Sequence, residues 1–465
     1  MSDIEQVARN AREASTALQS ITSEQKSLIL RAIKDKLAAN KEVILAANEA
    51  DKAKAKQEVE AGKLSASLFK RLDIEGKGGE KFETMLQGIL DVDGLFDPIG
   101  QVSLARRLDD GLDLYRVTCP VGVCLVIFEA RPEVVVNIAC LAIKSSNAVI
   151  LKGGKEAGAT NQKLADLIRE AIESTPTPAG ATPFPMNAVQ LVSRREDIDK
   201  LLDQDRYIDL VVPRGSNSLV RYIQGHTRIP VLGHADGICS VFLDESADVA
   251  KAPHLVVDSK TDYPAACNAA ETLLVHSKAL STAFNEVAKA LFAAGVKLHA
   301  DDRVYKYLEA ESGLSIPKGQ LVQAQDDDFD KEFLDLEIAV RVVDSLDEAI
   351  AHINEHGSQH TDVIITESEA NAETFMRRVG SAGVYWNASS RFADGFRYGF
   401  GTEVGVSTNK THARGPVGLE GLTIYKYRIY GRGQGAGDYG IGAGKRSYKH
   451  EDIPLDPTVR NKFVI

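Results

Sequence analysis

The chain has 465 residues, of which 55 are lysine or arginine and 66 are aspartate or glutamate, so its formal net charge is −11. A hydrophobic content of 44% is that of a folded protein with two or three domains, and the acidic balance argues against a chain that coats nucleic acid or an anionic membrane. Any anionic substrate needs a local basic cluster. No apolar run reaches the length of a membrane span, and the N-terminus lacks a signal-like stretch, so we expect a cytoplasmic protein.

The first part of the chain, up to about residue 98, has the apolar spacing of helices, and Ser23 is placed to cap the second of them. Residues 103–118 differ, because Asp110-Gly111 lies between two alternating stretches and indicates a β-hairpin. The hairpin has few apolar residues for a core strand. We therefore expect it to project and to pair with a partner subunit.

From residue 120 onward, apolar strands alternate with amphipathic helices. Strands are expected at 121–128, 148–152, 188–192, 210–212, 230–232 and 240–243. The alternation restarts after about residue 256, with strands at 271–275, 339–343 and 363–366, and a last strand is expected at 422–430. This order predicts two doubly wound α/β domains with parallel sheets, in which ligands bind beyond the carboxyl ends of the strands.

Two strand ends have the composition of a nucleotide site. Lys152-Gly153 follows one strand, where glycine permits close backbone approach and lysine can reach a ribose or phosphate; a solvated loop is the alternative. Gly215-Ser216 follows another strand and opens a helix whose free N–H groups would attract a pyrophosphate; an ordinary capped helix is the alternative. Neither stretch has the standard glycine spacing of a dinucleotide fingerprint.

The five cysteines are few, odd in number and widely spaced, which argues against a disulfide framework or a zinc site and implies a reducing compartment. Four of them lie in apolar surroundings and are expected in the core: Cys119, Cys124, Cys140 and Cys239. Cys267 instead lies in a polar turn of small residues directly before a strand. That setting suits a nucleophile, which needs access and nearby backbone N–H donors.

Three histidines, His352, His356 and His360, are spaced by four and could hold a metal on an unbroken helix, but Gly357 indicates that the helix ends before the third. We therefore expect no metal site there. Polar residues are dense from 387 to 418, which favours a binding loop over an ordinary surface loop. Another arginine, Arg131, lies between a strand and a helix, where it could hold a carboxylate or phosphate.

Several long motifs, in this order, resemble the aldehyde dehydrogenase superfamily and, within it, the γ-glutamyl phosphate reductase family in its eukaryotic, fungal branch. They are Ile127-Phe-Glu-Ala-Arg-Pro-Glu133, Leu151-Lys-Gly-Gly-Lys-Glu156, Val212-Pro-Arg-Gly-Ser-Asn217, Gly233-His-Ala-Asp-Gly-Ile-Cys239, Tyr263-Pro-Ala-Ala-Cys-Asn-Ala-Ala-Glu-Thr272, Val384-Tyr-Trp-Asn-Ala-Ser-Ser-Arg391 and His412-Ala-Arg-Gly-Pro-Val-Gly-Leu419. The resemblance extends over nearly the whole chain.

The resemblance implies an aldehyde-dehydrogenase-like fold with three parts. An NADP-binding Rossmann-like domain is expected at 1–102 and 119–255, and a catalytic domain at 256–421. A small β oligomerisation domain is expected at 103–118 and 422–465. The implied partners are L-glutamyl 5-phosphate as substrate, further copies of the chain in a homo-oligomer, and functional coupling to a glutamate 5-kinase.

The resemblance also assigns roles to residues. Cys267 is the expected nucleophile. The expected contacts of the NADPH cofactor are Lys152, Gly153, Gly215, Ser216 and Glu403. The expected contacts of the polyanionic substrate are Arg131, Asn387, Arg391 and Arg414. The expected reaction is reduction of L-glutamyl 5-phosphate through a Cys267 thioester to L-glutamate 5-semialdehyde and phosphate, the second step of proline biosynthesis.

One departure separates the chain from hydrolytic aldehyde dehydrogenases, which remain the alternative. Those enzymes carry a glutamate upstream of the cysteine that activates water. Residues 231–240 contain no glutamate here. The absence of that base suits a reductase, whose thioester must persist until hydride arrives. The second donor to the oxyanion is not identified, because Glu-Ala-Arg-Pro at 129–132 replaces the asparagine of those enzymes.

Overall fold

A computed structural model describes residues 3–194, 196–310 and 312–465. The chain forms two compact units, of which the first comprises Met1–Leu232, Phe400–Gly405 and Val417–Ile465, and the second Gly233–Gly399 and Val406–Pro416. Two short strands stand where the chain passes between them, β14 (Gly405–Ser407) and β15 (Gly415–Val417). Within the described residues, no helix combines the length and apolarity that crossing a membrane requires.

The N-terminal part of the first unit is helical, as predicted. Its helices are α1 (Asp3–Leu18), α2 (Ser23–Ala39), α3 (Lys41–Glu60), α4 (Ala66–Arg71) and α5 (Glu80–Gly94). The predicted cap of α2 was wrong by one residue. Thr22 accepts a hydrogen bond from the N–H of Gln25, and the Gln25 side chain accepts one from the N–H of Thr22. This capping box leaves Ser23 inside the helix.

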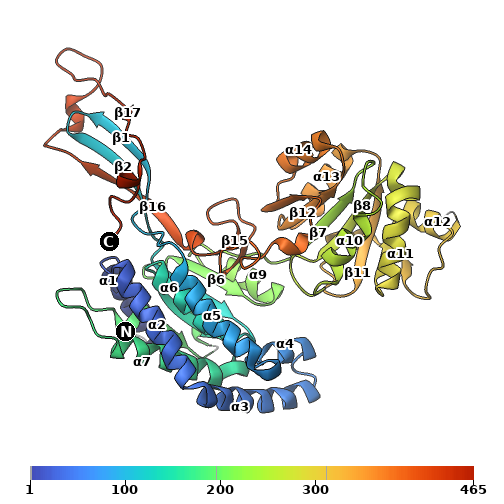
Figure 1. Ribbon diagram of the computed structural model, residues 1–465, viewed down its shortest axis with the longest axis horizontal. Helices are drawn as coiled ribbons and strands as arrows, with labels where there is room; N and C mark the ends of the chain where they lie inside the picture. The colour runs from blue at the N-terminus through green and yellow to red at the C-terminus, as the bar shows by residue number, and fades with distance from the viewer. Residues whose placement is uncertain (1–2, 195, 311) are drawn as a thin grey trace. The chain divides into compact units, whose positions relative to one another are not determined.

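A parallel sheet lies at the centre of the first unit, with the order β5-β4-β3-β6 (Figure 1). Its strands are β3 (Val123–Phe128), β4 (Ala148–Gly153), β5 (Val189–Val192) and β6 (Leu210–Arg214). Its crossover helices are α6 (Glu133–Lys144), α7 (Gly158–Ser174), α8 (Asp197–Leu202) and α9 (Asn217–His226). The predicted strand at 230–232 was wrong, because this stretch makes only an isolated bridge between Val211 and Val231.

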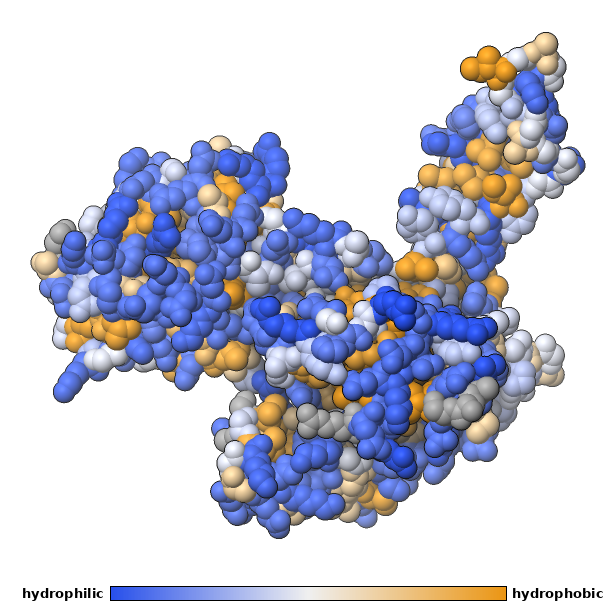
Figure 2. Space-filling view, turned by 180° about the vertical axis from the view of Figure 1, so that it is seen from behind, coloured by the Kyte–Doolittle hydropathy of each residue, from blue (hydrophilic) through white to orange (hydrophobic). Residues whose placement is uncertain are grey.

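The predicted hairpin forms part of an antiparallel sheet with the order β16-β2-β1-β17. The strands are β1 (Val102–Asp109), β2 (Leu112–Pro120), β16 (Thr423–Tyr430) and β17 (Glu451–Asp452). Gly111 in the turn has φ +71°, a conformation that glycine adopts readily. Tyr115 and Val117 pack on Phe463, which follows α15 (Pro457–Arg460). Apolar side chains also remain on the surface of this sheet (Figure 2).

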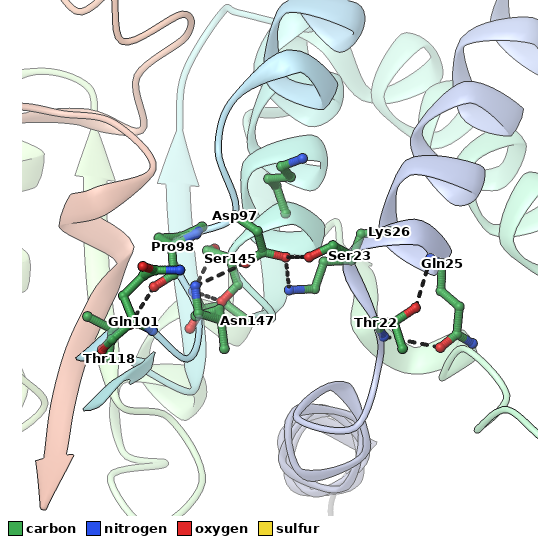
Figure 3. A network of polar contacts seen from close by, with 12 residues as sticks. Thr22, Ser23, Gln25, Lys26, Asp97, Pro98, Gln101, Thr118, Ser145 and Asn147 are labelled. Carbon is green, nitrogen blue, oxygen red and sulfur yellow. Dashed lines mark hydrogen bonds and ion pairs between the residues drawn. The ribbon is translucent and has the colours of Figure 1, made fainter. Parts of the chain in front are cut away.

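A buried polar network lies where the hairpin begins (Figure 3). The Asp97 carboxylate accepts hydrogen bonds from Ser23 Oγ at 2.7 Å and from Lys26 Nζ at 2.8 Å. Thr118 Oγ1 donates to the carbonyl of Pro98 at 2.5 Å, and the side chain of Asn147 donates to the carbonyl of Leu422 at 2.8 Å. These bonds tie α2 and β2 to the segment that precedes β1, and the residue before β4 to the residue before β16.

The second unit has a seven-stranded parallel sheet with the order β10-β9-β11-β8-β7-β12-β13. Its strands are β7 (Cys239–Leu243), β8 (Ala270–His276), β9 (Lys297–Ala300), β10 (Leu321–Gln323), β11 (Glu337–Val343), β12 (Thr361–Ile365) and β13 (Gly383–Trp386). The predicted strands β7, β8, β11 and β12 are confirmed. Strands β9, β10 and β13 were not predicted.

Helices cover both faces of this sheet (Figure 1). One face packs against α10 (Ala252–Thr261), α11 (Asn285–Ala293) and α12 (Asp302–Ala310), and the other against α13 (Leu346–His356) and α14 (Glu369–Arg378). The doubly wound α/β architecture predicted from the sequence is thus observed.

Candidate active site

Cys267 lies in the turn that joins α10 to β8. The N–H of Ala266 donates to the carbonyl of Tyr263 at 3.1 Å, and the N–H of Ala269 donates to that of Ala266 at 2.9 Å, so the turn is closed on both sides of the cysteine. Cys267 is half-buried, whereas the other four cysteines are buried, as predicted. It is therefore the one thiol of the chain that combines access with a fixed backbone.

Two histidines stand beside this thiol. His234, Cys267 and His360 each offer one ligand atom, and these three atoms lie within 4.8 Å of one another. The reason is topological, since the three residues lie on the segments that enter β7, β8 and β12, and these strands are neighbours in the sheet. The cluster thus occupies the amino ends of three parallel strands, not the carboxyl ends where we expected ligands.

The two imidazoles have defined orientations. Their rings make a T-shaped contact with centroids 4.8 Å apart. His234 Nδ1 lies 2.9 Å from the carbonyl oxygen of Val406, which can only accept, so this nitrogen carries the proton and the neutral ring has its lone pair on Nε2. His360 is 1% exposed, its Nδ1 lies 2.9 Å from Thr361 Oγ1, and its Nε2 is buried without a hydrogen-bond partner.

Sequence reasoning missed both histidines as companions of the cysteine. It considered His360 only with His352 and His356, and helix α13 indeed ends at His356, so the three do not share a helix. Both histidines lie a few residues before apolar strands, and this position is the sequence signal that could have indicated them. That signal is weak, because the neighbour relation of β7, β8 and β12 is not written in local spacing.

Gly237 allows the loop before β7 to approach the cysteine closely. A Cβ atom at this position would lie 2.2 Å from the carbonyl oxygen and 2.6 Å from the Cα of Cys267, so any side chain would displace the turn. Cys239 is fully buried, and its Sγ donates to the same carbonyl at 3.4 Å. Burial raises the pKa of this thiol well above its ordinary value, so it remains a donor.

A buried ion pair joins the two elements on either side of the Cys267 turn. Lys260 Nζ lies 2.6 Å from Glu271 Oε2, and both side chains are fully buried. Lys260 is the last residue but one of α10 and Glu271 is the second residue of β8, so the pair bridges the two elements that flank Cys267. Burial raises the pKa of Glu271 to about 7 and lowers that of Lys260, although each partner favours the charged form of the other.

The predicted substrate residue Asn387 has a structural role in the second unit. It adopts φ +51°, its side-chain oxygen accepts from the N–H of Thr366 at 3.0 Å, and its amide donates to the carbonyl of Thr366 at 2.9 Å. These two bonds dock it on the end of β12. They leave little of the amide for a ligand.

The two predicted arginines of the second unit have different surroundings. Arg391 Nε donates to the carbonyl of Asp262 at 2.8 Å, and its side chain is 11% exposed. The carboxylate of Asp262 also pairs with Arg397 at 2.9 Å. Arg391, Arg397 and Asp262 thus form a group of two cations and one anion. Arg414 is exposed and donates to the carbonyl of Gly380.

The carboxyl ends of the first unit's sheet carry the predicted cofactor residues. The chain runs from β3 outward to β4 and β5 and then returns to β6 on the other side of β3, which places a topological switch point between β3 and β6. Lys152 is the last residue but one of β4, is 4% exposed, and donates from Nζ to the carbonyl of Gly153 at 2.7 Å. A Cβ atom at Gly153 would lie 2.3 Å from Asn161 Nδ2.

The start of α9 already attracts an anion. The N–H of Ser216 donates to the carboxylate of Glu129 at 3.0 Å, and a Cβ atom on Gly215 would lie 2.6 Å from the same carboxylate. Ser216 is the N-cap of α9, as one of the two predicted alternatives had it, although its side chain caps no N–H. The positive end of the helix is thus neutralised by a side chain.

Two further predicted residues lie in the first unit. Glu403 Oε1 lies 3.8 Å from Arg214 Nη1, and both side chains are 19% exposed. Arg131 is half-buried just before α6, where its charge opposes the burial that raises the pKa of Glu133. Arg131 thus lies in the first unit, whereas Arg391 and Arg414 lie in the second unit with Cys267.

Comparisons with known proteins agree with this architecture. Residues 1–304 match the model of the aldehyde dehydrogenase family. The chain is 52% identical over 455 residues to a probable γ-glutamyl phosphate reductase of Schizosaccharomyces pombe, covering 97% of this chain and 98% of the relative. It is also 52% identical over 465 residues to the γ-glutamyl phosphate reductase of Saccharomyces cerevisiae, with 98% and 99% covered.

The fold is likewise similar to a solved structure. A crystal structure of γ-glutamyl phosphate reductase from Thermotoga maritima superposes with a TM-score of 0.85 at 34% sequence identity, covering 93% of this chain and 99% of that one. The similarity includes the parallel sheets and the small antiparallel sheet.

Proposed function

The chain belongs to the aldehyde dehydrogenase family and, within it, to the γ-glutamyl phosphate reductases, and we propose that it reduces L-glutamyl 5-phosphate to L-glutamate 5-semialdehyde and phosphate in proline biosynthesis. The observation that carries this proposal is Cys267, a half-buried thiol held in a closed turn beside two imidazoles. The alternative remains a hydrolytic aldehyde dehydrogenase.

Cys267 acts as the nucleophile in this reaction. Its thiolate attacks the acyl carbon of the substrate, a C–S bond forms, and the C–O bond to phosphate breaks. Neutral His234, with its lone pair on Nε2, is the nearby base that can take the thiol proton. The phosphate leaves without a strong general acid, because it is already a good leaving group.

The family implies a nicotinamide cofactor, and we assign NADPH. The residues of the first unit fit such a group, because Gly153 and Gly215 leave no room for a side chain and the start of α9 already attracts a carboxylate. Lys152, Gly153, Gly215, Ser216 and Glu403 would hold it, and Glu129 would have to leave Ser216 for a pyrophosphate. When bound, NADPH supplies the hydride that converts the thioester to the aldehyde.

The substrate is a polyanion and requires cations. Arg391 is the strongest candidate, since it lies beside the Cys267 turn and shares a single carboxylate with Arg397. Arg414 and Arg131 remain candidates. Asn387 remains one on the family resemblance, although its amide is engaged with Thr366 at the carboxyl end of β12.

We assign residues 1–102 and 119–255 to cofactor binding and 256–421 to catalysis. Residues 103–118 and 422–465 form the antiparallel sheet, and we assign them to homo-oligomer formation. This assignment is supported by exposed apolar residues on β16, namely Ile424, Tyr425, Tyr427, Ile429 and Tyr430. The proposal includes a cytoplasmic enzyme that receives its unstable substrate from a glutamate 5-kinase.

Reverse turnover tests the reaction class. The purified chain would be given glutamate 5-semialdehyde and NADP⁺, with and without inorganic phosphate. We expect repeated turnover, beyond the first NADPH per chain, only with phosphate, because phosphate must accept the acyl group before the thiol can react again. Equal NADPH formation without phosphate would mean that water resolves the thioester and would support the hydrolytic alternative.

A further inference from the structure

We propose that His234, Cys267 and His360 form a binding site for a borderline-soft divalent cation, typified by Zn²⁺, which blocks the thiol reversibly. Two imidazoles and one thiolate are ligands that Zn²⁺ and Co²⁺ accept and that Mg²⁺ and Ca²⁺ do not favour. The inference concerns binding and goes beyond the reaction proposed above.

The distances suit a metal site. Tetrahedral Zn²⁺ takes nitrogen at about 2.0–2.1 Å and sulfur at about 2.3 Å, so its ligand atoms lie roughly 3.3–3.7 Å apart. The three ligand atoms here already lie within 4.8 Å of one another. Rotation of the half-buried Cys267 side chain would shorten these distances, while His234, held by the carbonyl of Val406, and the buried His360 stay in place.

The surroundings of both imidazoles match those of metal ligands. A ligating histidine usually donates its other ring N–H to a carbonyl, a carboxylate or water, which fixes the tautomer. His234 Nδ1 donates to the carbonyl of Val406, and His360 Nδ1 lies 2.9 Å from the hydroxyl of Thr361. His234 is therefore prepared to offer Nε2, and His360 offers its own Nε2 in the tautomer whose Nδ1 donates to Thr361.

An independent observation points to a ligand at this place. His360 Nε2 is buried and has no hydrogen-bond partner, an arrangement that costs free energy unless something binds there. A cation would satisfy it. Glu332 interacts electrostatically with His234 and adds an acidic group near the site, although burial raises the pKa of its carboxyl.

Metal binding exchanges the thiol proton of Cys267 for the cation. The thiol of Cys267 loses its proton to solvent, an M–S bond forms, and the two imidazoles donate their lone pairs without further change. Three protein ligands leave a fourth position for water or for an oxygen of phosphate. A thiolate bound in this way cannot attack an acyl carbon, so under the proposed function the cation inhibits, and a chelator restores activity.

Cobalt absorption tests the site without requiring turnover. The full-length, tag-free chain, first treated with a chelator, would be titrated with Co²⁺. We expect a thiolate-to-cobalt band in the near ultraviolet and tetrahedral bands in the visible, saturating at one ion per chain. Cys267→Ser should abolish the thiolate band, and His234→Gln and His360→Gln should each weaken Co²⁺ binding by at least about tenfold.

His356→Gln is the matched control. His352 and His356 form another imidazole pair, with ring centroids 4.4 Å apart. Among the described residues, neither ring is seen to contact a cysteine. We expect this variant to bind Co²⁺ like the parent chain. A thiolate band that survives Cys267→Ser, or Co²⁺ binding lost in His356→Gln and retained in His360→Gln, would overturn the proposal. Circular dichroism of each variant verifies that it is folded.

Discussion

The two parallel sheets of this chain carry their candidate sites at opposite ends of the strands. In the first unit, the cofactor candidates follow β4 and β6, at the carboxyl ends and next to the topological switch point. In the second unit, the Cys267 cluster precedes β7, β8 and β12, at the amino ends.

The difference shows that one folding pattern can build two kinds of site. At carboxyl ends, glycine turns and helix starts provide backbone N–H groups that suit phosphates. The amino ends of parallel strands are not followed by helix starts. The site of the second unit is therefore built from side chains on the three loops that lead into β7, β8 and β12. These loops are held together by close packing at Gly237 and by the Lys260–Glu271 pair.

Removal of the nucleophile should separate the two sites most sharply. Cys267→Ala should lower reductase activity by about 10⁴-fold or more, because the covalent step has no substitute. Binding of NADPH, measured by fluorescence titration, should change little, since its candidate residues lie in the other unit. Cys140→Ala, which alters a buried core cysteine, is the control. Retained activity in Cys267→Ala would refute the covalent route.

Breaking the buried ion pair should have the largest effect on stability. Lys260→Met leaves the Glu271 carboxylate with only the N–H of Leu334, at 3.4 Å, and should cost about 3–5 kcal/mol of unfolding free energy. Lys26→Met in the first unit should cost less, because Asp97 keeps hydrogen bonds from Ser23 and from the backbone. Urea denaturation measures both; an equal loss would contradict this ranking.

The cost of Lys260→Met should depend on pH. Burial already raises the pKa of Glu271 to about 7 from an ordinary value of 4.5, and loss of the lysine raises it further. The folded variant then binds more protons than the unfolded chain, so its stability falls as the pH rises from about 4.5. We expect a smaller defect at pH 5 than at pH 8. A defect independent of pH would show that Glu271 is not the group left uncompensated.

A methyl group at position 237 should impair only the Cys267 site, at the amino ends of the strands of the second unit. Gly237→Ala would place Cβ 2.2 Å from the carbonyl oxygen of Cys267 and should shift the thiol by enough to lower kcat by about 10²-fold. Gly225→Ala has no atom within 4 Å of its Cβ and serves as the control. Full activity in Gly237→Ala would mean that the loop does not position the cysteine.

The smallest effect is expected at the carboxyl-end site. Glu129→Gln removes the negative charge that occupies the start of α9, and should lower the KM for NADPH about two- to fivefold, as the helix-end energy of about 0.3–1 kcal/mol implies. Glu170→Gln, on the surface of α7, is the charge-matched control. A raised KM in Glu129→Gln would indicate that the carboxylate assists the cofactor.

Much of this organisation was predictable from local pattern. Alternating apolar strands and helices gave the doubly wound architecture, and Asp110-Gly111 gave the hairpin, because both signals are short in range. Cys267 was recognisable because its turn is polar and made of small residues, unlike the surroundings of the other cysteines.

The companions of Cys267 were not predictable in the same way. His234 and His360 meet the thiol only because β7, β8 and β12 are neighbours, a long-range pairing that leaves no mark in residue spacing. The bonds of the Asn387 amide to the backbone of Thr366 were likewise not visible in its polar sequence setting. Besides strands β9, β10 and β13, the sequence did not disclose the order of the strands in the sheet.

Trapping the acyl enzyme tests the central role of Cys267 most directly. The chain would be incubated with glutamate 5-semialdehyde and NADP⁺ without phosphate, quenched in acid, and analysed by peptide mass spectrometry. We predict a glutamyl adduct on the peptide that contains Cys267, formed with one NADPH and removed when phosphate is added. An adduct on another residue, or NADPH formed in the first turnover without any adduct, would contradict the thioester mechanism.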